Sequence, residues 1–347
     1  MIPAAFLWPD LVQYPTQPES GPWPTLLQSD GSDLDEARAA AAATAAGPAP
    51  GSAPPTAVAA PPATPGPAAA PTPAAAGPGT ALAPRAVLPA LAAPRGAAAD
   101  AAGNLYVFTG DDSRLHKFGP DGKALADWPV VDAAGKALIE GAAVVVLGDQ
   151  VGVLDATTST LIRFTLSGEA AGTTQLCSCY FPRGLAVARD GNLWVADTGQ
   201  AHVLKVTPDG KLLQTIGGQG NAPGQFVEPA SVWESPQGTL YVADIGNARV
   251  QSFDAQGAPL AAWPAGASVA RDGNRLAGDA RGQVLVAEVA AGAVVRYDAQ
   301  GHETGRWTYA PQGTPLAPAG IAPAGGDSFL VLYLQDGRAA LFTPGAP

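Results

Sequence analysis

The stretch GNLWVADTGQAHVLKVTPDG, residues 191–210, decides the fold of this chain because its pattern recurs along the sequence. Apolar residues alternate with other residues over 193–196 and again over 203–206, and a polar turn containing a glycine joins the two runs. Alternation with a period of two residues is typical of β-strands that bury one face. The stretch therefore predicts two short antiparallel strands joined by a turn.

Six copies of this frame follow one another at intervals of 46, 42, 47, 44 and 44 residues. They close at Gly122, Gly168, Gly210, Gly257, Gly301 and Gly345. A further strand-like segment precedes each frame and another follows it, so that each repeat contains four strands. Four strands in about 40–45 residues are the signature of a β-propeller blade. We predict an all-β fold, a six-bladed β-propeller of four-stranded antiparallel blades, over residues 85–347.

The phase of the repeat predicts how the ring closes. The last copy stops two residues after its third strand, so the sixth blade lacks a fourth strand. The spare segment Arg85–Leu91 precedes the first blade and is strand-like, and Pro89 is compatible with an outer edge. We expect this segment to complete blade six and to cover its exposed edge.

The region before the repeats differs in composition. Residues 48–84 consist almost entirely of alanine, proline, glycine, serine and threonine, and they predict a disordered linker. Residues 32–47 fit a short alanine-rich helix capped by Ser32, which is marginal in isolation. Residues 1–31, rich in proline and aromatic side chains, predict an irregular segment outside the repeats.

Charge and hydropathy restrict the partners. A net charge of −11 argues against nucleic acid, because phosphate binding requires a basic face. No apolar run reaches the ~20 residues of a transmembrane helix, and the N-terminus lacks the basic region of a signal peptide. Linkers of this composition often tether domains outside the cytoplasm. We therefore favour an extracytoplasmic, secreted or membrane-tethered location and a monomeric propeller.

Two copies carry a family resemblance. Residues 196–199, Ala-Asp-Thr-Gly, and residues 243–250, Ala-Asp-Ile-Gly-Asn-Ala-Arg-Val, resemble the NHL repeat, as does Phe181-Pro182-Arg183-Gly184 upstream. The match is close in blades three and four, fair in blade one, weaker in blade five and degenerate in blades two and six. The resemblance covers about three quarters of the chain and implies a propeller, but this fold hosts enzymes, sensors and scaffolds alike.

The repeated acid of the frame is interpreted as structural. It recurs at one turn of four blades, as Asp155, Asp197, Asp244 and Glu288. We expect these carboxylates to accept backbone N–H bonds within their own turns rather than to catalyse a reaction.

Two kinds of repeated side chain are expected to pack between blades. His202 of blade three occupies the repeat position of Arg114 and Arg249. A cation at this position is expected to pair with a turn acid or to pack against the next blade. Trp128, Trp263 and Trp307 share one phase of the repeat and are predicted to fill space between blades. Trp233 breaks the pattern in an innermost strand, and we expect it to narrow the central channel or to project into it.

Metal-type features are few. The two cysteines form a Cys177-Ser178-Cys179 motif whose state, free, bridged or metal-bound, the sequence leaves open. The histidines His116, His202 and His302 fall at different blade positions. Peptidyl-hydroxyglycine lyases, which resemble this repeat family, place metal-binding histidines toward the channel, and gluconolactonase-like propellers hold calcium with carboxylates. Neither set is found here, so we expect no metal, no cofactor and no catalytic residue.

One face of the propeller carries residues that could bind a ligand or a protein partner. The loops before the innermost strands and the turns between second and third strands share that face, which we call the loop face. Its guanidinium groups could grip a carboxylate or an acidic loop of a protein; the competing interpretation is that they neutralise neighbouring acids. The candidate ligand- or partner-binding residues are Arg95, Arg183, Asn274, Arg275, Arg114, His202, Asn247, Arg249 and Trp233.

Three functional hypotheses follow. The first is a non-enzymatic propeller that acts as a binding, sensing or scaffold module through its loop face, with a protein or a small anionic ligand as partner. The second is a metal-dependent enzyme of the lactonase or hydroxyglycine-lyase type. In the third, the chain is the C-terminal extracytoplasmic domain of a larger membrane protein, comparable to sensor domains of bacterial membrane kinases.

Overall fold

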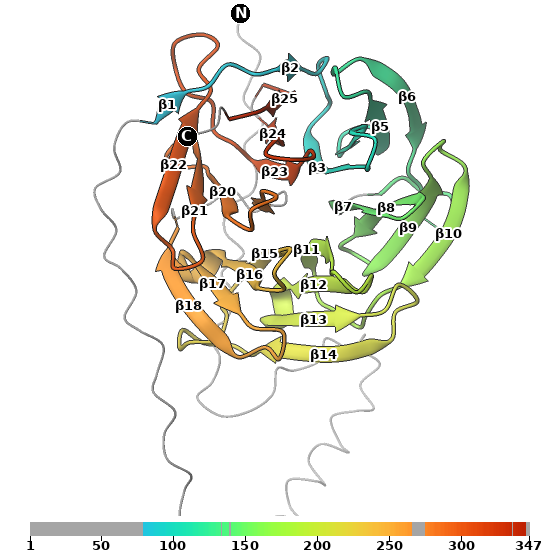
Figure 1. The fold of residues 1–347 in the computed structure, drawn as a ribbon. Helices are drawn as coiled ribbons and strands as arrows, with labels where there is room; N and C mark the ends of the chain where they lie inside the picture. The colour runs from blue at the N-terminus through green and yellow to red at the C-terminus, as the bar shows by residue number, and fades with distance from the viewer. Residues whose placement is uncertain (1–78, 133, 139, 266–274, 335, 345–347) are drawn as a thin grey trace, which may run out of the picture. The chain divides into compact units, whose positions relative to one another are not determined.

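A computed structural model describes residues 79–132, 134–138, 140–265, 275–334 and 336–344. The predicted irregular segment 1–31, the predicted helix 32–47 and most of the predicted linker 48–84 lie outside the described residues. The described residues form six β-sheets arranged as blades around a common centre, as predicted (Figure 1).

The first three blades are regular four-stranded antiparallel sheets. Blade one contains β3 (Pro94–Ala99), β4 (Leu105–Thr109), β5 (Arg114–Phe118) and β6 (Ala124–Pro129). Blade two contains β7 (Gly141–Leu147), β8 (Gln150–Asp155), β9 (Thr160–Thr165) and β10 (Ala170–Gln175). Blade three contains β11 (Pro182–Val187), β12 (Leu193–Asp197), β13 (His202–Val206) and β14 (Leu212–Gly217).

The last three blades follow the same order. Blade four contains β15 (Pro229–Glu234), β16 (Leu240–Asp244), β17 (Arg249–Phe253) and β18 (Pro259–Pro264). Blade five contains β19 (Leu276–Gly278), β20 (Val284–Glu288), β21 (Ala293–Tyr297) and β22 (Glu303–Thr308). Blade six contains β23 (Gly320–Pro323), β24 (Phe329–Tyr333) and β25 (Arg338–Phe342). Short 3₁₀ turns, η1 (Thr198–Gln200) and η2 (Ile245–Asn247), join the second and third strands of blades three and four.

The ring closes as the repeat phase predicted. Strand β2 (Ala86–Val87) pairs antiparallel with β25, with Ala86 opposite Leu341 and Val87 opposite Ala340. The N–H of Leu88 extends this pairing by donating to the carbonyl of Ala339 at 2.9 Å. Blade six therefore obtains its fourth strand from the segment that precedes blade one (Figure 1).

A second strand from the same region was not predicted. Strand β1 (Thr80–Ala81) pairs in parallel with β22 and gives blade five a fifth, outermost strand. Leu82 continues the contact through an N–H bond to the carbonyl of Thr308. The end of the predicted linker is thus part of the propeller, because the free edge of β22 offers unpaired carbonyl and N–H groups that two uncharged residues can satisfy.

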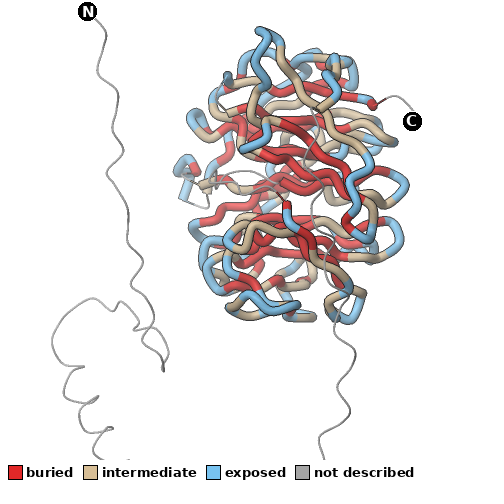
Figure 2. The backbone as a smooth tube through the Cα atoms, turned by 90° about the vertical axis from the view of Figure 1, so that its left-hand side faces the viewer, coloured by how far each residue is buried: buried red, intermediate tan, exposed pale blue. Residues whose placement is uncertain are grey.

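The core is divided into six apolar clusters, and each lies between two neighbouring blades. Buried strand residues occupy the middle of each blade and exposed residues the turns (Figure 2). Trp128 and Trp263 lie in the clusters between blades one and two and between blades four and five, and Trp307 packs against the cluster between blades five and six. The repeat-phased tryptophans therefore fill the space between blades, as predicted.

Candidate binding face of the propeller

The entry to each innermost strand positions the arginines of the loop face. The first strands of neighbouring blades contact one another around the ring centre. Strands β3 and β11 each begin with an irregularity in register, between Pro94 and Gly96 and between Pro182 and Gly184. Arg95 and Arg183 are the extra residues at these bulges, which redirect a side chain away from the strand pattern.

The same bulge is present in blades two and four, but there it carries alanine. The register shifts between Gly141 and Ala143 and between Pro229 and Ser231 place Ala142 and Ala230 at the extra position. The arginines therefore come from alternate blades, one and three, and both are partly exposed.

Arg95 already has a carboxylate partner. Its Nη1 lies 3.3 Å from Oε2 of Glu140, in the loop that leads into blade two, and the two side chains are 23% and 40% exposed. A Cβ on Gly110 would lie 2.2 Å from Nε of Arg95, so the guanidinium group extends over this glycine. Arg95 is thus held in place, with about a quarter of its side chain exposed.

Arg275 and Asn274 differ from this pair. Arg275 is 2% exposed, and its backbone N–H donates to Oγ of Ser231 in blade four at 3.1 Å. Its side chain therefore belongs to the packing between blades and not to an open rim. Asn274 lies outside the described residues.

The turn acids are buried, but two of them also bind a segment other than the one predicted. Asp155 does accept the N–H of Thr157 within its own turn at 2.8 Å. Asp197 accepts the N–H of Gln200 in its own turn and also that of Tyr180. Asp244 accepts the N–H groups of Val227 and Glu228, and like Tyr180 these lie in the loops that lead into the first strands. Burial raises the pKa of Asp197 above its usual value, against the N–H bonds from Tyr180 and Gln200 that favour the carboxylate.

Glu288 departs further from the prediction. It accepts the hydroxyl of Tyr297 at 2.6 Å and the guanidinium group of Arg306 at 3.2 Å. A glutamate is one methylene longer than the aspartates, and its carboxylate reaches side chains on the third and fourth strands of blade five. The interpretation of the four acids as structural rests on these contacts.

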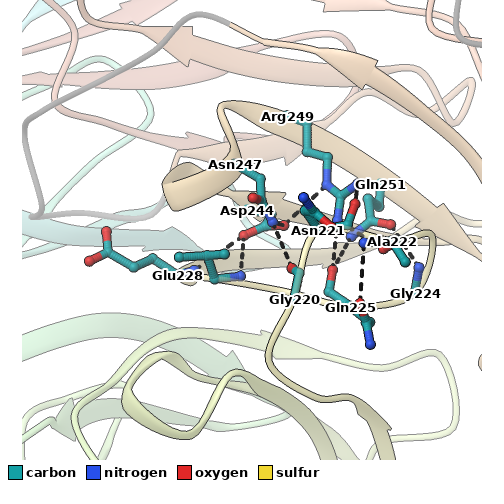
Figure 3. A network of polar contacts seen from close by, with 11 residues as sticks. Gly220, Asn221, Ala222, Gly224, Gln225, Glu228, Asp244, Asn247, Arg249 and Gln251 are labelled. Atoms are coloured by element: carbon teal, nitrogen blue, oxygen red, sulfur yellow. Dashed lines mark hydrogen bonds and ion pairs between the residues drawn. The ribbon is translucent and has the colours of Figure 1, made fainter. Parts of the chain in front are cut away.

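Asn247 and Arg249 are used to hold the loop between blades three and four (Figure 3). Arg249 is paired with Asp244 at 3.1 Å and donates to the carbonyls of Asn221, Ala222 and Gln225 at 2.8–3.1 Å. Asn247 donates to Gly220 O at 3.0 Å and to Asp244 at 2.7 Å. With the carboxylate of Asp244 fully buried, these two side chains stabilise the loop, and they offer little for an external ligand.

Arg114 and His202 occupy the same repeat position in blades one and three. Arg114 forms an ion pair with Asp127 on the outermost strand of its own blade. His202 lies opposite Asp197 in the pairing of β12 with β13. The position of Arg114 therefore matches the expectation of a cation that pairs with an acid, whereas His202 is placed only opposite Asp197 in the strand pairing.

Trp233 packs against residues of blades four and five. Its ring stacks on Tyr241 with centroids 5.6 Å apart, and it packs against the cluster between blades four and five. A Cβ on Gly278 of blade five would lie 1.9 Å from Cζ2 of the indole. Trp233 consequently fills a gap that a glycine leaves in the next blade, because alternate residues of a strand point to opposite faces of the sheet.

Blade one contains a polar cluster that the repeat pattern did not single out. Oγ1 of Thr109 lies 2.9 Å from Nε2 of His116 and 2.5 Å from a carboxylate oxygen of Asp112. The set resembles a nucleophile with a base and an acid, but Thr109 is 0% exposed, and its Oγ1 also lies 3.1 Å from the carbonyl oxygen of Arg114. Burial lowers the pKa of His116. The cluster closes the turn where other blades use a buried aspartate.

The cysteines and histidines provide no gathered metal ligands in the described part of the chain. Cys177 and Cys179 form a disulfide bond, which settles the state that the sequence left open. Among the described residues, no three side chains of histidine, cysteine, aspartate or glutamate come together as metal ligands.

Fold and sequence similarity identify the class of this protein. The structure aligns with a calcium-binding regucalcin from Agrobacterium tumefaciens, with a TM-score of 0.54, 19% identity and coverage of 75% of this chain and 93% of the other. It also aligns with a streptogramin B lyase, with a TM-score of 0.52, 12% identity and coverage of 77% and 88%. At these identities the alignments show the fold alone, a β-propeller.

Sequence comparison narrows the class to the NHL-type propellers. The chain is 37% identical over 83 residues to NHL repeat-containing protein 2 of Gallus gallus, which is 21% of this chain and 11% of that protein. It is 32% identical over 83 residues to a probable peptidyl-α-hydroxyglycine α-amidating lyase of Caenorhabditis elegans, which is 22% and 24% of the two chains. The matches span about a quarter or less of these relatives. Part of the chain is thus similar in sequence to NHL-type proteins, and its described residues form a six-bladed β-propeller.

These relatives correct the expectation of a non-enzymatic protein. A second amidating lyase, from Drosophila melanogaster, is 33% identical over 90 residues, covering 24% of this chain and 17% of that protein. Relatives with the names of lyases point toward an enzymatic family, although each match is short. No protein-family profile matches the chain. The described residues contain no helix with the length and apolarity that a membrane crossing requires.

Proposed function

We propose that the propeller binds a carboxylate-bearing ligand on its loop face, between the entries of blades one and three. The observation that carries this proposal is the pair Arg95 and Arg183 at the same bulge of alternate blades, where blades two and four have alanine. Each guanidinium group provides forked donors that match carboxylate oxygens.

The existing partner of Arg95 is compatible with such binding. Glu140 lies at the surface with 40% of its side chain exposed, and an ion pair of this kind contributes about 0–1 kcal/mol. An incoming carboxylate can therefore share or replace Glu140 at small cost, whereas Arg249 could be recruited only by breaking its buried pair with Asp244.

The proposal is tested by titrating the full chain with a dicarboxylate series from malonate to adipate by calorimetry. We expect Arg95→Gln and Arg183→Gln each to weaken binding about ten-fold, the loss of one charge-assisted contact. Arg114→Gln, which removes a cation paired with Asp127 on the outer strand, serves as the matched control and should bind like the unchanged chain. Equal affinity in all variants, or no binding of any dicarboxylate, would contradict the proposal.

A lyase acting on a peptide is the second candidate, and the similarity to two amidating lyases favours it. The loop face is where such a substrate would be held by its carboxylate. Incubation of the full chain with a peptidyl-α-hydroxyglycine and detection of the peptide amide by mass spectrometry tests this candidate. Sensing, scaffolding, an extracytoplasmic location and a monomeric state remain predictions.

A further inference from the structure

Two aromatic side chains on the loop face of blade three are exposed to solvent. Tyr180 is 61% and Phe181 39% exposed, and their rings stand nearly perpendicular with centroids 5.6 Å apart. They directly precede β11 and lie two and three positions before Arg183 in sequence. Exposed aromatic pairs of this kind are common in protein interfaces, where tyrosine and arginine contribute most of the binding energy.

The loop that carries these rings is held from several sides. Cys177 and Cys179 are joined by a disulfide, and the carbonyls of Cys177, Ser178 and Cys179 accept side-chain bonds from Gln175, Gln200 and Ser159. The next residue is fixed as well, because the N–H of Tyr180 donates to buried Asp197 and its carbonyl accepts the N–H of Gly199, each at 2.9 Å. The rings are thus presented on a preorganised backbone, which lowers the entropic cost of binding.

Phe181 has an unfavourable backbone conformation. Its φ of 52° lies in the left-handed region, which bulky side chains rarely adopt. The equivalent residue of blade one, Ala93, has the same φ and carries no ring. Glu140 and Glu228 take the corresponding places before the first strands of blades two and four. Strain of this kind is found where a side chain is kept for what it contacts.

We infer that Tyr180 and Phe181 form a docking site for a protein partner, in a polypeptide segment where an apolar side chain lies beside an aspartate or glutamate. The apolar side chain packs on the two rings and on Val227, which is 39% exposed in the equivalent loop of blade four. The acidic side chain reaches Arg183. This part of the inference rests on the proposed function, since it uses the same arginine; the rings are an independent observation.

The test selects a random dodecapeptide phage library on the full chain and synthesises the most enriched peptide for affinity measurement. We expect a consensus that combines an apolar residue with Asp or Glu. Tyr180→Ala and Phe181→Gly should each weaken binding of that peptide about ten-fold or more. Phe181→Gly should also unfold at a temperature no lower than that of the unchanged chain, because glycine accepts this φ. Leu212→Ala removes a 55% exposed apolar side chain from the same blade and should leave binding unchanged.

The outcomes separate the two proposals. Loss of binding in Arg183→Gln together with full binding in Tyr180→Ala would overturn the docking site and leave the carboxylate site intact. Loss in Tyr180→Ala with full binding in Arg183→Gln would overturn the acidic partner and count against the carboxylate site. A proline-rich or basic consensus, or no enrichment above the library, would overturn the inference.

Discussion

The N–H of Leu91 donates a 2.8 Å hydrogen bond to the carbonyl of Gly337, and so the segment before blade one is joined to the last turn of blade six. Gly337 has a φ of 57°, and a Cβ there would lie 2.5 Å from the carbonyl oxygen of Leu91. The ring is therefore closed by a contact that tolerates no side chain.

Because of this contact, we expect Gly337→Ala to lower the free energy of unfolding by about 1–3 kcal/mol more than the same replacement at another glycine with the same φ. Gly326 supplies the match, since it has the same φ of 57° and no atom within 4 Å of an added Cβ. Urea denaturation of both alanine variants measures the difference. Equal stabilities would show that the closing segment yields to the added methyl group.

Removal of the guanidinium group of Arg249 should destabilise the chain strongly. Arg249→Ala leaves the carboxylate of Asp244, which is 0% exposed, without its charged partner and frees three loop carbonyls. We expect a loss of about 3–5 kcal/mol. The control is Arg114→Ala, whose surface pair with Asp127 should be worth less than about 1 kcal/mol. Similar losses in the two variants would contradict the structural role of Arg249.

Replacement by alanine should affect stability strongly at Trp233 and weakly at Tyr180. Trp233→Ala should cost about 3 kcal/mol, because it leaves a cavity beside Gly278 between blades four and five. Tyr180→Ala should change stability by less than about 0.5 kcal/mol, because its ring is mostly in solvent. Thermal unfolding of both variants is the measurement. A neutral Trp233→Ala would support the earlier expectation that the indole points into the channel.

Asp190 gives a pH-dependent prediction. Desolvation raises the pKa of this carboxyl, but hydrogen bonds from Lys205 and Asn192 outweigh it and hold the pKa at about 2. Because the folded pKa lies below the unfolded one, the stabilisation is present above the unfolded pKa and is lost as the pH falls through about 2.

Asp190→Asn should therefore lower the unfolding temperature most at about pH 5 and above, with the difference shrinking toward about pH 2. Lys205→Met removes the partner, which lies 2.8 Å away, and should show the same pH profile. A penalty that stays constant over this range would show that the ion pair does not stabilise the fold.

Several features were predictable because they repeat. Six copies of one hairpin frame, three tryptophans in one phase and a missing last strand were sufficient to predict six blades and their closure. The candidate site was harder to predict from the sequence. Asp197 and Asp244 share a sequence pattern with Asp155, yet each also accepts backbone hydrogen bonds from a loop 16 or 17 residues away. Tyr180 and Phe181 were not predicted as a site, although the unusual sequence Cys-Ser-Cys-Tyr-Phe-Pro gave a signal.

The sequence by itself determined the blade, because alternating apolar residues and turn glycines act over a few neighbours and recur in each repeat. Tertiary structure alone decided which side chains are left for a ligand. In the folded ring, Arg249 binds loop carbonyls, Trp233 packs against Gly278 and Arg275 is buried. A disulfide and four hydrogen bonds that involve side chains hold the loop on which Tyr180 and Phe181 are exposed to solvent. The contacts of these side chains depend on how neighbouring blades pack. Residues in neighbouring blades are about 45 positions apart in the sequence, so the local sequence does not show which of them will be in contact.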